Sequence, residues 1–256
     1  MDSVRIVQFS DLHLLADPQG TVRGARTLPR LQACLEHARR NAFPADALVL
    51  SGDLVQDDLA AYGTVELLFD NLDIPVLLIP GNHDVPDEMQ RRFARAPFRF
   101  GGCHRLGAWA VVLLDSWFAE ALDGEGRLGP ARLAELESTL HGLEAEHACL
   151  IIHHPPIPLE AAGMDRLRLQ DGEQLLAAVG RHPKVRAVAW GHAHQSLDVY
   201  RPGPLRLMCS PATSMQFKPR VDGFVIDERP PGYRVIDLQA DGGIATEVVW
   251  LEHYRD

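Results

Sequence analysis

Short apolar runs along the chain end, one after another, in small clusters of polar residues. The runs lie at residues 4–10, 46–51, 74–80, 147–152 and 185–190, and the clusters that follow them read DLH, GDL, GNHD, HHPP and GHAH. Apolar runs of this length that are bounded by Gly, Pro, Asn and Asp are typical of buried β-strands. The pattern therefore predicts five strands that each end in a polar loop.

Between these runs the apolar residues recur at helical spacing. Helices are predicted over residues 27–40, 57–72, 129–143 and 171–182. Thr27 is expected to cap the first helix, with Pro29 in its first turn. Further strands are expected over residues 109–116, 233–238 and 244–251, the last two as an antiparallel hairpin. Strands that alternate with helices favour an α/β domain with two packed, mixed sheets and helices outside. We expect one domain over residues 1–256.

Composition narrows the classes of partner. The 256 residues include 35 acidic and 25 basic ones, for a net charge of −10. Proteins that bind nucleic acid usually present a basic face, so we expect no nucleic-acid polymer as partner. No apolar run approaches the roughly 20 residues that span a bilayer, and the first strand begins too early for a signal peptide. We therefore expect a cytoplasmic protein without a membrane partner, and we expect its four cysteines to be buried, inert thiols.

Half of the twelve histidines lie in the polar clusters. These six are His13, His83, His153, His154, His192 and His194. The other six lie in helical or hairpin surroundings, and we assign them to the surface. In open α/β sheets, ligands bind beyond the carboxyl ends of the strands. The clustered histidines are therefore expected to meet in one site.

The residue types in these clusters are typical of a metal centre. Seven candidate ligands are present: Asp11, His13, Asp53, Asn82, His153, His192 and His194. They offer oxygen and imidazole donors without a thiolate, which suits iron, manganese or zinc. Seven ligands are more than one ion needs, whereas two ions could share the carboxylate of Asp53. Since only two ligands are acidic, two divalent ions would leave a positive site that attracts a phosphate, and such ion pairs suit displacement at phosphorus.

The motifs DLH, GDLVQD, GNHD, HHPP and GHAH, in this order, resemble those of the calcineurin-like metallophosphoesterases. The stretches GHAHQSLDVY, SMQFKP and PGYRVIDLQADG extend the similarity to bacterial class III 3′,5′-cyclic AMP phosphodiesterases over almost the full chain. The fold that this resemblance implies is a four-layer αββα sandwich of two mixed β-sheets flanked by helices.

The resemblance also implies roles for the clustered residues. A first metal ion would be held by Asp11, His13, Asp53 and His194, and a second by Asp53, Asn82, His153 and His192. Iron and manganese are the expected metals, with zinc as the alternative. Substrate contacts are expected from His13, Asn82, His83, His154 and His194, although His154 could instead donate a supporting hydrogen bond.

His83 and Asp84 are the expected catalytic residues. His83 would reach over the metals and stabilise transition-state charge or the departing oxygen, while Asp84 would fix its tautomer and favour its protonated form. Gly81 would allow the tight turn that aims these side chains. Asp57 is expected to cap the helix that follows it.

The expected reaction is hydrolysis of 3′,5′-cyclic AMP to 5′-AMP by a metal-bound hydroxide. A first alternative is another small phosphodiester, such as a glycerophosphodiester or a 2′,3′-cyclic nucleotide. A second is a non-enzymatic, metal-stabilised interaction module, against which the complete set of ligands and His83 argues. Met215, Phe217 or Trp117 could stack on a base or simply pack in the core, and the sequence assigns no physical role to SMQFKP.

Overall fold

The computed structural model describes residues 3–256. Its main strands are β1 (Val4–Phe9), β2 (Ala47–Leu50), β3 (Val76–Leu78), β4 (Phe98–Phe100), β5 (Gly102–Leu106), β6 (Trp109–Leu114), β7 (His147–Ile152), β8 (Val185–Trp190), β9 (Leu197–Tyr200), β10 (Arg206–Cys209), β13 (Gly232–Leu238) and β14 (Ile244–Trp250). Two short strands, β11 (Gln216–Phe217) and β12 (Ile226–Asp227), pair with each other. The helices are α1 (Thr27–Asn41), α2 (Tyr62–Phe69), α3 (Pro86–Arg92), α4 (Gly129–His141), α5 (Ala162–Arg166) and α6 (Gly172–Gly180), with a 3₁₀ turn η1 (Leu59–Ala61) before α2.

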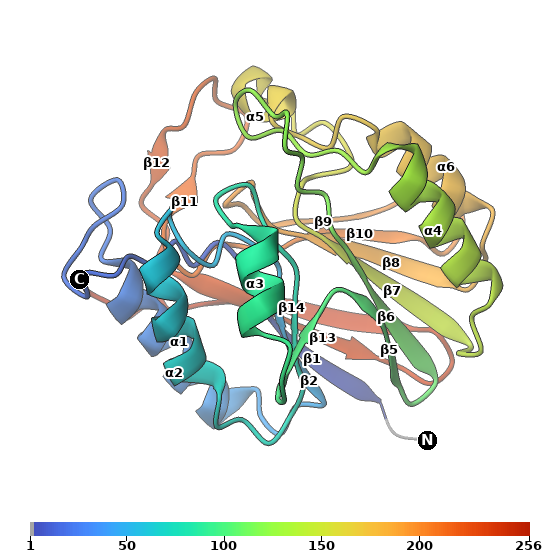
Figure 1. Cartoon of the computed structure of the whole chain (residues 1–256), viewed down its shortest axis with the longest axis horizontal. Helices are drawn as coiled ribbons and strands as arrows, with labels where there is room; N and C mark the ends of the chain where they lie inside the picture. Colours follow the sequence, from blue (N-terminus) through green and yellow to red (C-terminus); the bar gives the residue numbers. More distant parts are fainter. Residues whose placement is uncertain (1–2) are drawn as a thin grey trace.

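The twelve main strands form two six-stranded sheets (Figure 1). In the first sheet the order is β14-β13-β1-β2-β3-β4, where β1 to β4 run parallel and the β13–β14 hairpin runs antiparallel. In the second the order is β5-β6-β7-β8-β10-β9, where β5 and β9 are antiparallel edge strands. Both sheets are therefore mixed, as the sequence predicts.

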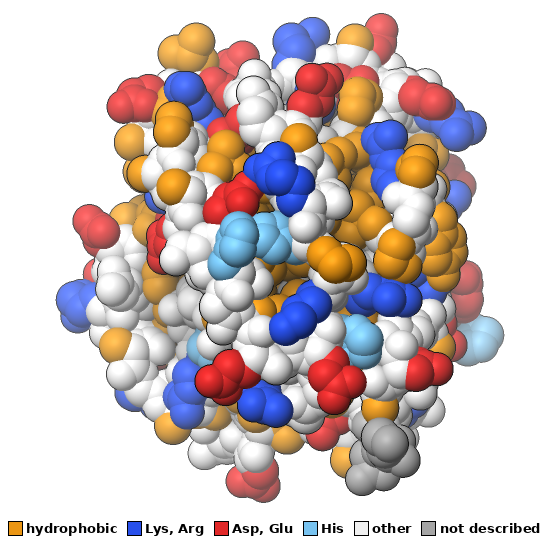
Figure 2. Space-filling view, turned by 90° about the vertical axis from the view of Figure 1, so that its right-hand side faces the viewer, with side chains coloured by type: hydrophobic (Ala, Val, Ile, Leu, Met, Phe, Trp, Pro, Cys, Tyr) orange, Lys and Arg blue, Asp and Glu red, His pale blue; other side chains and the backbone are white. Residues whose placement is uncertain are grey.

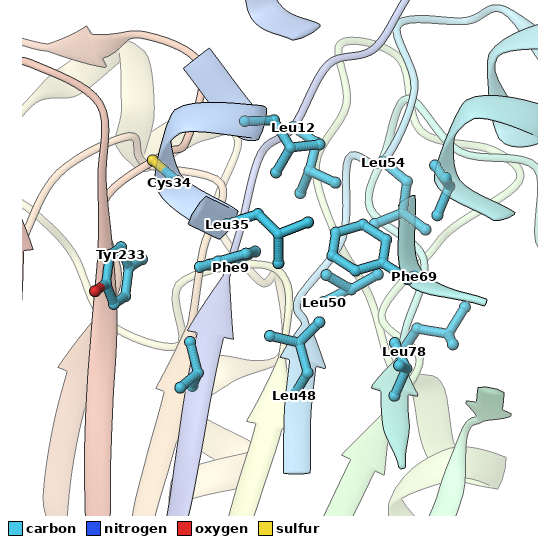
Figure 3. Packing of buried hydrophobic residues seen from close by; sticks show 14 of the residues in the cluster. Phe9, Leu12, Cys34, Leu35, Leu48, Leu50, Leu54, Phe69, Leu78 and Tyr233 are labelled. Carbon is cyan, nitrogen blue, oxygen red and sulfur yellow. The ribbon is translucent and has the colours of Figure 1, made fainter. Parts of the chain in front are cut away.

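The alternation of side chains along the strands builds the layers. Successive residues of a strand point to opposite faces of its sheet. In β2, Val49 packs between the two sheets against Ile151 of β7 and its neighbours. Leu48 and Leu50 point the other way, into a core that the helices α1 and α2 complete with residues such as Phe69 (Figure 3). The first sheet is thus buried on both faces.

The second sheet repeats this arrangement. Leu150 and Ile152 of β7 pack against Leu136 of α4 and Leu175 of α6. Fully burying one such aliphatic side chain stabilises the fold by about 1.5–3 kcal/mol, so all three apolar layers contribute to stability. Helices cover the outer face of each sheet (Figure 1), and the predicted αββα sandwich is confirmed.

Two predicted helix caps are wrong. Arg26, not Thr27, is the N-cap residue of α1, and no side-chain hydrogen bond closes that end. The helix predicted over residues 57–72 is the 3₁₀ turn η1 followed by the shorter α2, and its N-terminus is capped by Asp58, whose carboxylate accepts from the Ala60 amide. Two adjacent aspartates before an apolar run do not reveal which of them turns toward the helix.

Several elements escape prediction because their patterns are weak. The edge strands β5 and β9 have only five and four residues and no fully buried side chain, and the helices α3 and α5 have seven and five residues. The cysteine prediction also needs a correction: Cys34, Cys149 and Cys209 are buried, but Cys103 in β5 is exposed.

Charged side chains of both signs lie on the surface of the protein. On the face shown in Figure 2, basic and acidic side chains are interleaved rather than gathered into a basic field. From residue 3 to the end of the chain, no helix has the length and apolar content required to cross a membrane.

Candidate metal centre

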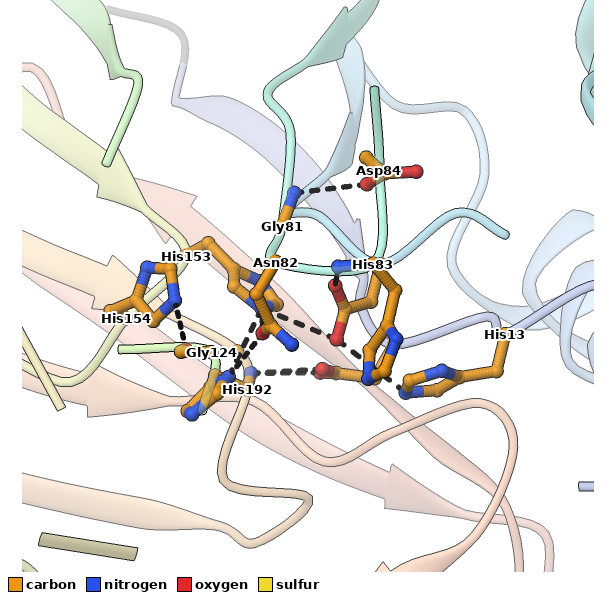
Figure 4. Close-up of polar contacts among 12 residues, drawn as sticks. His13, Gly81, Asn82, His83, Asp84, Gly124, His153, His154 and His192 are labelled. Carbon is orange, nitrogen blue, oxygen red and sulfur yellow. Dashed lines mark hydrogen bonds and ion pairs between the residues drawn. The ribbon is translucent and has the colours of Figure 1, made fainter. Parts of the chain in front are cut away.

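The polar loops of both sheets meet at one end of the sandwich (Figure 4). The loops after β1, β2 and β3 belong to the first sheet, and those after β7 and β8 belong to the second. They bring together all seven predicted ligand residues: Asp11, His13, Asp53, Asn82, His153, His192 and His194. Their role as ligands remains a prediction, which the following geometry supports.

A first set of ligand atoms lies around His13 and His194. The two Nε2 atoms are 3.0 Å apart. The Nε2 atom of His194 lies 3.5 Å from Asp11 Oδ1, and that of His13 lies 3.6 Å from Asp53 Oδ2. This is the set of four residues that the family resemblance assigns to the first ion.

A second set lies on the other side of Asp53. His153 Nε2 is 3.4 Å from Asp53 Oδ2 and 3.3 Å from Asn82 Oδ1. His192 Nδ1 lies 2.9 Å from the same Asn82 oxygen and 3.3 Å from His153 Nε2. Asp53 Oδ2 therefore adjoins both sets, as a bridging carboxylate must.

Backbone carbonyls orient two of the imidazoles. His153 Nδ1–H donates to the carbonyl of Ser51 at 2.8 Å, and His194 Nδ1–H donates to the carbonyl of Met215 at 2.7 Å. Each bond leaves the Nε2 lone pair directed at the centre, which is the usual arrangement behind a metal-ligating histidine. The ring atoms His13 Nδ1 and His192 Nε2 are buried without a hydrogen-bond partner among the described residues.

Burial sets the charges of the site. It lowers the pKa of His13 to about 4, and it lowers the pKa of His192 and His194 well below the usual range, so these rings are neutral. For Asp53 burial acts in the opposite direction, but His153, His13 and His83 together outweigh it and hold the pKa of that carboxyl well below its usual value. Burial lowers the pKa of His153, but Asp53 outweighs this effect and raises it to about 9. The three neutral imidazoles and the ionised, buried carboxylate are donors that a divalent ion requires, and binding of an ion would release the proton of His153. The residues therefore fit two adjoining ions.

The backbone of the ligand loops is strained. Five ligand residues have positive φ: Asp11 (54°), His13 (48°), Asp53 (52°), His192 (62°) and His194 (51°). Residues other than glycine rarely adopt this region, and such strain concentrates at functional sites. This conformation turns both ligands of the D-x-H segment (residues 11–13) and both ligands of the H-x-H segment (residues 192–194) toward the same centre.

Glycines beside the ligands are required by close approach. A Cβ atom on Gly81 would clash with Asp53 Oδ1, and one on Gly191 would clash with Ser10 Oγ and the carboxylate of Asp11. Gly81 is not among the glycines with positive φ. The expected reason for Gly81, a tight turn, is therefore replaced by a steric one: the Asn82 loop must pass directly against the bridging carboxylate.

Replacement of Gly81 by alanine is expected to weaken metal binding and activity by about 10- to 100-fold, because the added methyl group displaces Asp53, as changes behind metal ligands do. Titration with manganese and a rate measurement check this. Gly63→Ala is the matched control, since a Cβ there has no neighbour within 4 Å. That variant should keep wild-type binding and gain roughly 0.5–1 kcal/mol of helix stability. Unchanged manganese affinity in Gly81→Ala would contradict the steric argument.

His83 contacts a different carboxylate from the expected one. Its amide donates to Asp53 Oδ1 at 2.9 Å, and its ring Nδ1–H donates to Asp57 Oδ2 at 2.9 Å. Gln56 Nε2 donates to the same Asp57 oxygen. Burial lowers the pKa of His83, but Asp53 and Asp57 outweigh this effect and raise it above the usual value. Asp57 is thus the partner of the candidate acid and not a helix cap.

The role predicted for Asp84 is wrong. Its carboxylate is buried and accepts hydrogen bonds from the Gly81 amide (2.9 Å), the Leu54 amide (3.1 Å) and the Tyr62 hydroxyl (2.9 Å). It makes no contact with the His83 ring among the described hydrogen bonds and ion pairs. Asp84 instead holds the Asn82 loop against the loop that carries Asp53, because its carboxylate oxygens accept hydrogen bonds from an amide of each loop.

His154 supports a neighbouring loop. The ring is fully buried, and burial lowers its pKa to about 3. Its Nδ1 accepts from Ser116 Oγ at 2.8 Å, and its Nε2–H donates to the carbonyl of Gly124 at 3.1 Å. Both nitrogens are therefore used, and the geometry matches the supporting hydrogen bond rather than the substrate contact that we expected. The loop it holds passes close to Asn82.

A pocket of about 300 Å³ opens beside the ligand atoms. Four of the five residues expected to contact substrate line it: His13, Asn82, His83 and His194. Met215 and Phe217 line it as well, whereas Trp117 is not part of its wall. The pocket is at the small end of the range for ligand sites, which suits a small molecule.

The SMQFKP segment now has a physical role. Ser214 Oγ donates to the carbonyl of Asp11, the Met215 carbonyl orients His194, and the Phe217 amide donates to the carbonyl of His194 at 3.0 Å. The ring of Phe217 also stacks on that of His194, with centroids 4.6 Å apart. The segment therefore fixes the loops that carry two of the predicted ligands.

The six histidines assigned to the surface lie outside this site. Two of them, His141 and His182, lie beside Glu137, with ligand atoms within 4.8 Å of one another. Arg181 forms an ion pair with the Glu137 carboxylate. The negative charge of Glu137 is therefore already balanced by a residue of the same chain.

The sequence did not reveal that Asp57 and Gln56 lie beside the His83 ring or that Ser116 contacts His154. Asp57 and Gln56 lie within the GDLVQD motif, and that position is the only signal for them. Ser116 follows β6 at the same end of the second sheet as His153 follows β7, so strand-end position could have indicated it.

Comparison with known proteins agrees with the geometry. The sequence model of the calcineurin-like phosphoesterase family matches residues 4–196. A probable cyclic nucleotide phosphodiesterase of Synechococcus sp. is 34% identical over 98% of this chain and 93% of its own. The 3′,5′-cyclic adenosine monophosphate phosphodiesterase CpdA of Escherichia coli (strain K12) is 34% identical over 98% of this chain and 91% of its own.

Solved structures share the fold at low sequence identity. A dimetal phosphatase from Danio rerio superposes with a TM-score of 0.67 at 14% identity, over 98% of this chain and 99% of its own. GAP50, described as the anchor in the inner membrane complex of Plasmodium, gives 0.68 at 12% identity, over 98% of this chain and 85% of its own. Since proteins described so differently share this fold, the fold alone does not specify an activity.

Proposed function

The chain belongs to the calcineurin-like phosphoesterase family, and from this premise we propose that it is a metal-dependent phosphodiesterase that hydrolyses 3′,5′-cyclic AMP to 5′-AMP. The observation that supports the reaction best is the pair of buried donor sets that share Asp53. The substrate is supported by the relatives named as cyclic nucleotide phosphodiesterases, which align over nearly the whole chain.

We assign the ligands as the sequence predicts. One ion would be held by Asp11, His13, Asp53 and His194, and the other by Asp53, Asn82, His153 and His192. Iron and manganese are the proposed metals, with zinc as the alternative. When bound, such ions activate a water molecule and neutralise negative charge on the phosphate.

The chain's own groups complete the chemistry. Asn82 offers a neutral oxygen, so it binds without cancelling the charge that attracts the phosphate. His83 lines the pocket, and its Nδ1–H is held by Asp57. This leaves Nε2 as the nitrogen available to the pocket, and Asp53 and Asp57 raise the pKa of the ring, which favours its protonated form. His83 can therefore transfer a proton from Nε2 to the departing 3′ oxygen.

The site requires both halves of the chain, since its ligands come from the first sheet and the second. We therefore propose that residues 1–256 act as one domain on a small-molecule substrate, without a nucleic-acid polymer or a membrane as partner. The expected cytoplasmic location stays a prediction.

The test is hydrolysis by the purified chain with added manganese. We expect 3′,5′-cyclic AMP to give a higher kcat/KM than cyclic GMP, 2′,3′-cyclic AMP or glycerophosphocholine, and we expect a chelator to abolish activity reversibly. A preference for one of the last two substrates would favour the broader phosphodiesterase. Failure to hydrolyse even bis-p-nitrophenyl phosphate would favour a non-enzymatic module.

A further inference from the structure

The pocket beside the metal centre has a second wall that phosphate chemistry does not require. Besides the candidate ligands it is lined by Val22, Met164, Leu167, Met215, Phe217 and Phe224, together with the cation of Arg23. A phosphodiester needs only the metal side of this pocket. The apolar side must therefore contact whatever is esterified to the phosphate.

A tight hairpin places Arg23 at this wall. The amide of Val22 donates to the carbonyl of Ala25 at 3.0 Å, and the amide of Ala25 donates back at 2.9 Å. Arg23 (φ 50°) and Gly24 (φ 86°) between them both have positive φ, as a type I′ turn requires. An arginine in this conformation is costly, so its placement at the pocket needs a reason beyond turn formation.

The Arg23 guanidinium lies over two aromatic rings. Its Cζ atom is 5.4 Å from the centroid of Phe217 and 5.6 Å from that of Phe224. Among residues 3–256 no carboxylate lies within ion-pair distance of it, although the protein is acidic. The group therefore keeps its hydrogen-bond donors available in an exposed side chain.

The aromatic wall begins at a candidate ligand. His194 stacks on Phe217 with centroids 4.6 Å apart, and Phe217 contacts Phe224 at 5.5 Å. The row thus leads outward from the metal centre toward Arg23. A flat group joined through a sugar to a phosphate at the centre would lie against this row.

We propose that Arg23 and Phe224 form a subsite for the planar base of a nucleotide whose phosphate lies at the metal centre. The proposal rests on the phosphodiesterase function above and deepens it. Arginine and aromatic faces stack on any base, whereas the glycerol or choline group of a glycerophosphodiester has no face to stack. The subsite therefore selects nucleoside phosphates as a class.

The test compares cyclic AMP with its base-free analogue, methyl riboside 3′,5′-cyclic phosphate. In Arg23→Ala we expect kcat/KM for cyclic AMP to fall about tenfold, mainly through KM, as loss of one base-stacking contact does. The base-free analogue should be unaffected. Arg23→Lys keeps the positive charge but lacks the planar guanidinium that stacks on a base, so this variant should recover only part of the lost kcat/KM. The matched control is Arg220→Ala, which removes an exposed arginine outside this pocket and should change neither substrate.

Two results would overturn the subsite: equal losses on both substrates, or full recovery with lysine. A second measurement separates this inference from the choice of substrate. With bis-p-nitrophenyl phosphate as reporter, 5′-AMP should inhibit the wild-type enzyme about tenfold more strongly than ribose 5-phosphate, and Arg23→Ala should remove that difference. If this holds while cyclic AMP is not hydrolysed, the proposed function fails and the subsite stands. If the two inhibitors are equal in the wild type, the subsite fails.

Discussion

Replacement of Asp53 by alanine is expected to abolish phosphodiester hydrolysis and to remove bound metal. Its Oδ2 atom lies 3.6 Å from His13 Nε2 and 3.4 Å from His153 Nε2, so this carboxylate lies within ion-pair distance of a histidine in each donor set. Loss of a single charge-stabilising group costs about 10²–10³ in kcat. Because this substitution affects both ions, we expect a loss of more than about 10³-fold.

Elemental analysis of the purified variant, together with a rate measurement, checks this prediction. Asp53 also accepts the amide of His83, so thermal unfolding must show that the variant is folded. Asp73→Ala, which removes an exposed aspartate after α2, is the matched control and should retain both metals and full activity. Two ions bound at full occupancy in Asp53→Ala would refute the bridge.

Replacement of His83 by alanine should leave both ions in place and still lower kcat by about 10²–10³, or roughly 3–4 kcal/mol. The hydrogen bond from the amide of residue 83 to Asp53 remains in the variant, because its donor is a backbone N–H. What is lost is the imidazole that lines the pocket, whose contribution is made mainly in the transition state. The effect should therefore appear in kcat rather than KM.

The leaving group distinguishes the two roles of this imidazole. A p-nitrophenolate leaving group needs no proton, so its release should suffer less than cleavage of cyclic AMP if His83 acts as a general acid. Equal losses would instead indicate electrostatic stabilisation. The ring also lies close enough to His13 and Asp53 to be a ligand, and loss of an ion from the variant would show that it is one.

The partner of His83 provides an internal control. Asp57→Ala should lower kcat about tenfold in the wild-type background, in the range found for groups that orient catalytic side chains. In the His83→Ala background it should have no further effect, since the two residues act as a unit. His253→Ala, remote from the site, should change nothing.

The strand and ligand positions were accessible from the sequence because they depend on local patterns. An apolar run followed by a polar cluster marks a buried strand and its carboxyl end, and parallel strands bring such ends to one edge. This is why Asp11, Asp53 and His153 could be placed together before any fold was known. The residue types alone then limited the chemistry to oxygen and imidazole ligands.

The supporting groups were decided by the tertiary structure. Whether Asp57 or Asp84 meets His83 depends on backbone torsions, and a positive φ at Asp57 (53°) turns its carboxylate toward the ring. Asp84 is adjacent in sequence, yet it points to the amides of Leu54 and Gly81. Sequence proximity therefore favoured the wrong partner.

The sequence by itself thus indicated which groups could hold a metal ion, because a metal site needs particular donor atoms and the polar clusters at the strand ends supply them. The tertiary structure decided how those groups are held. Contacts such as His194 with Met215, or Arg23 with Phe224, join segments far apart in the chain. They follow from how loops pack over the ends of two sheets, and no periodicity in the sequence records that packing.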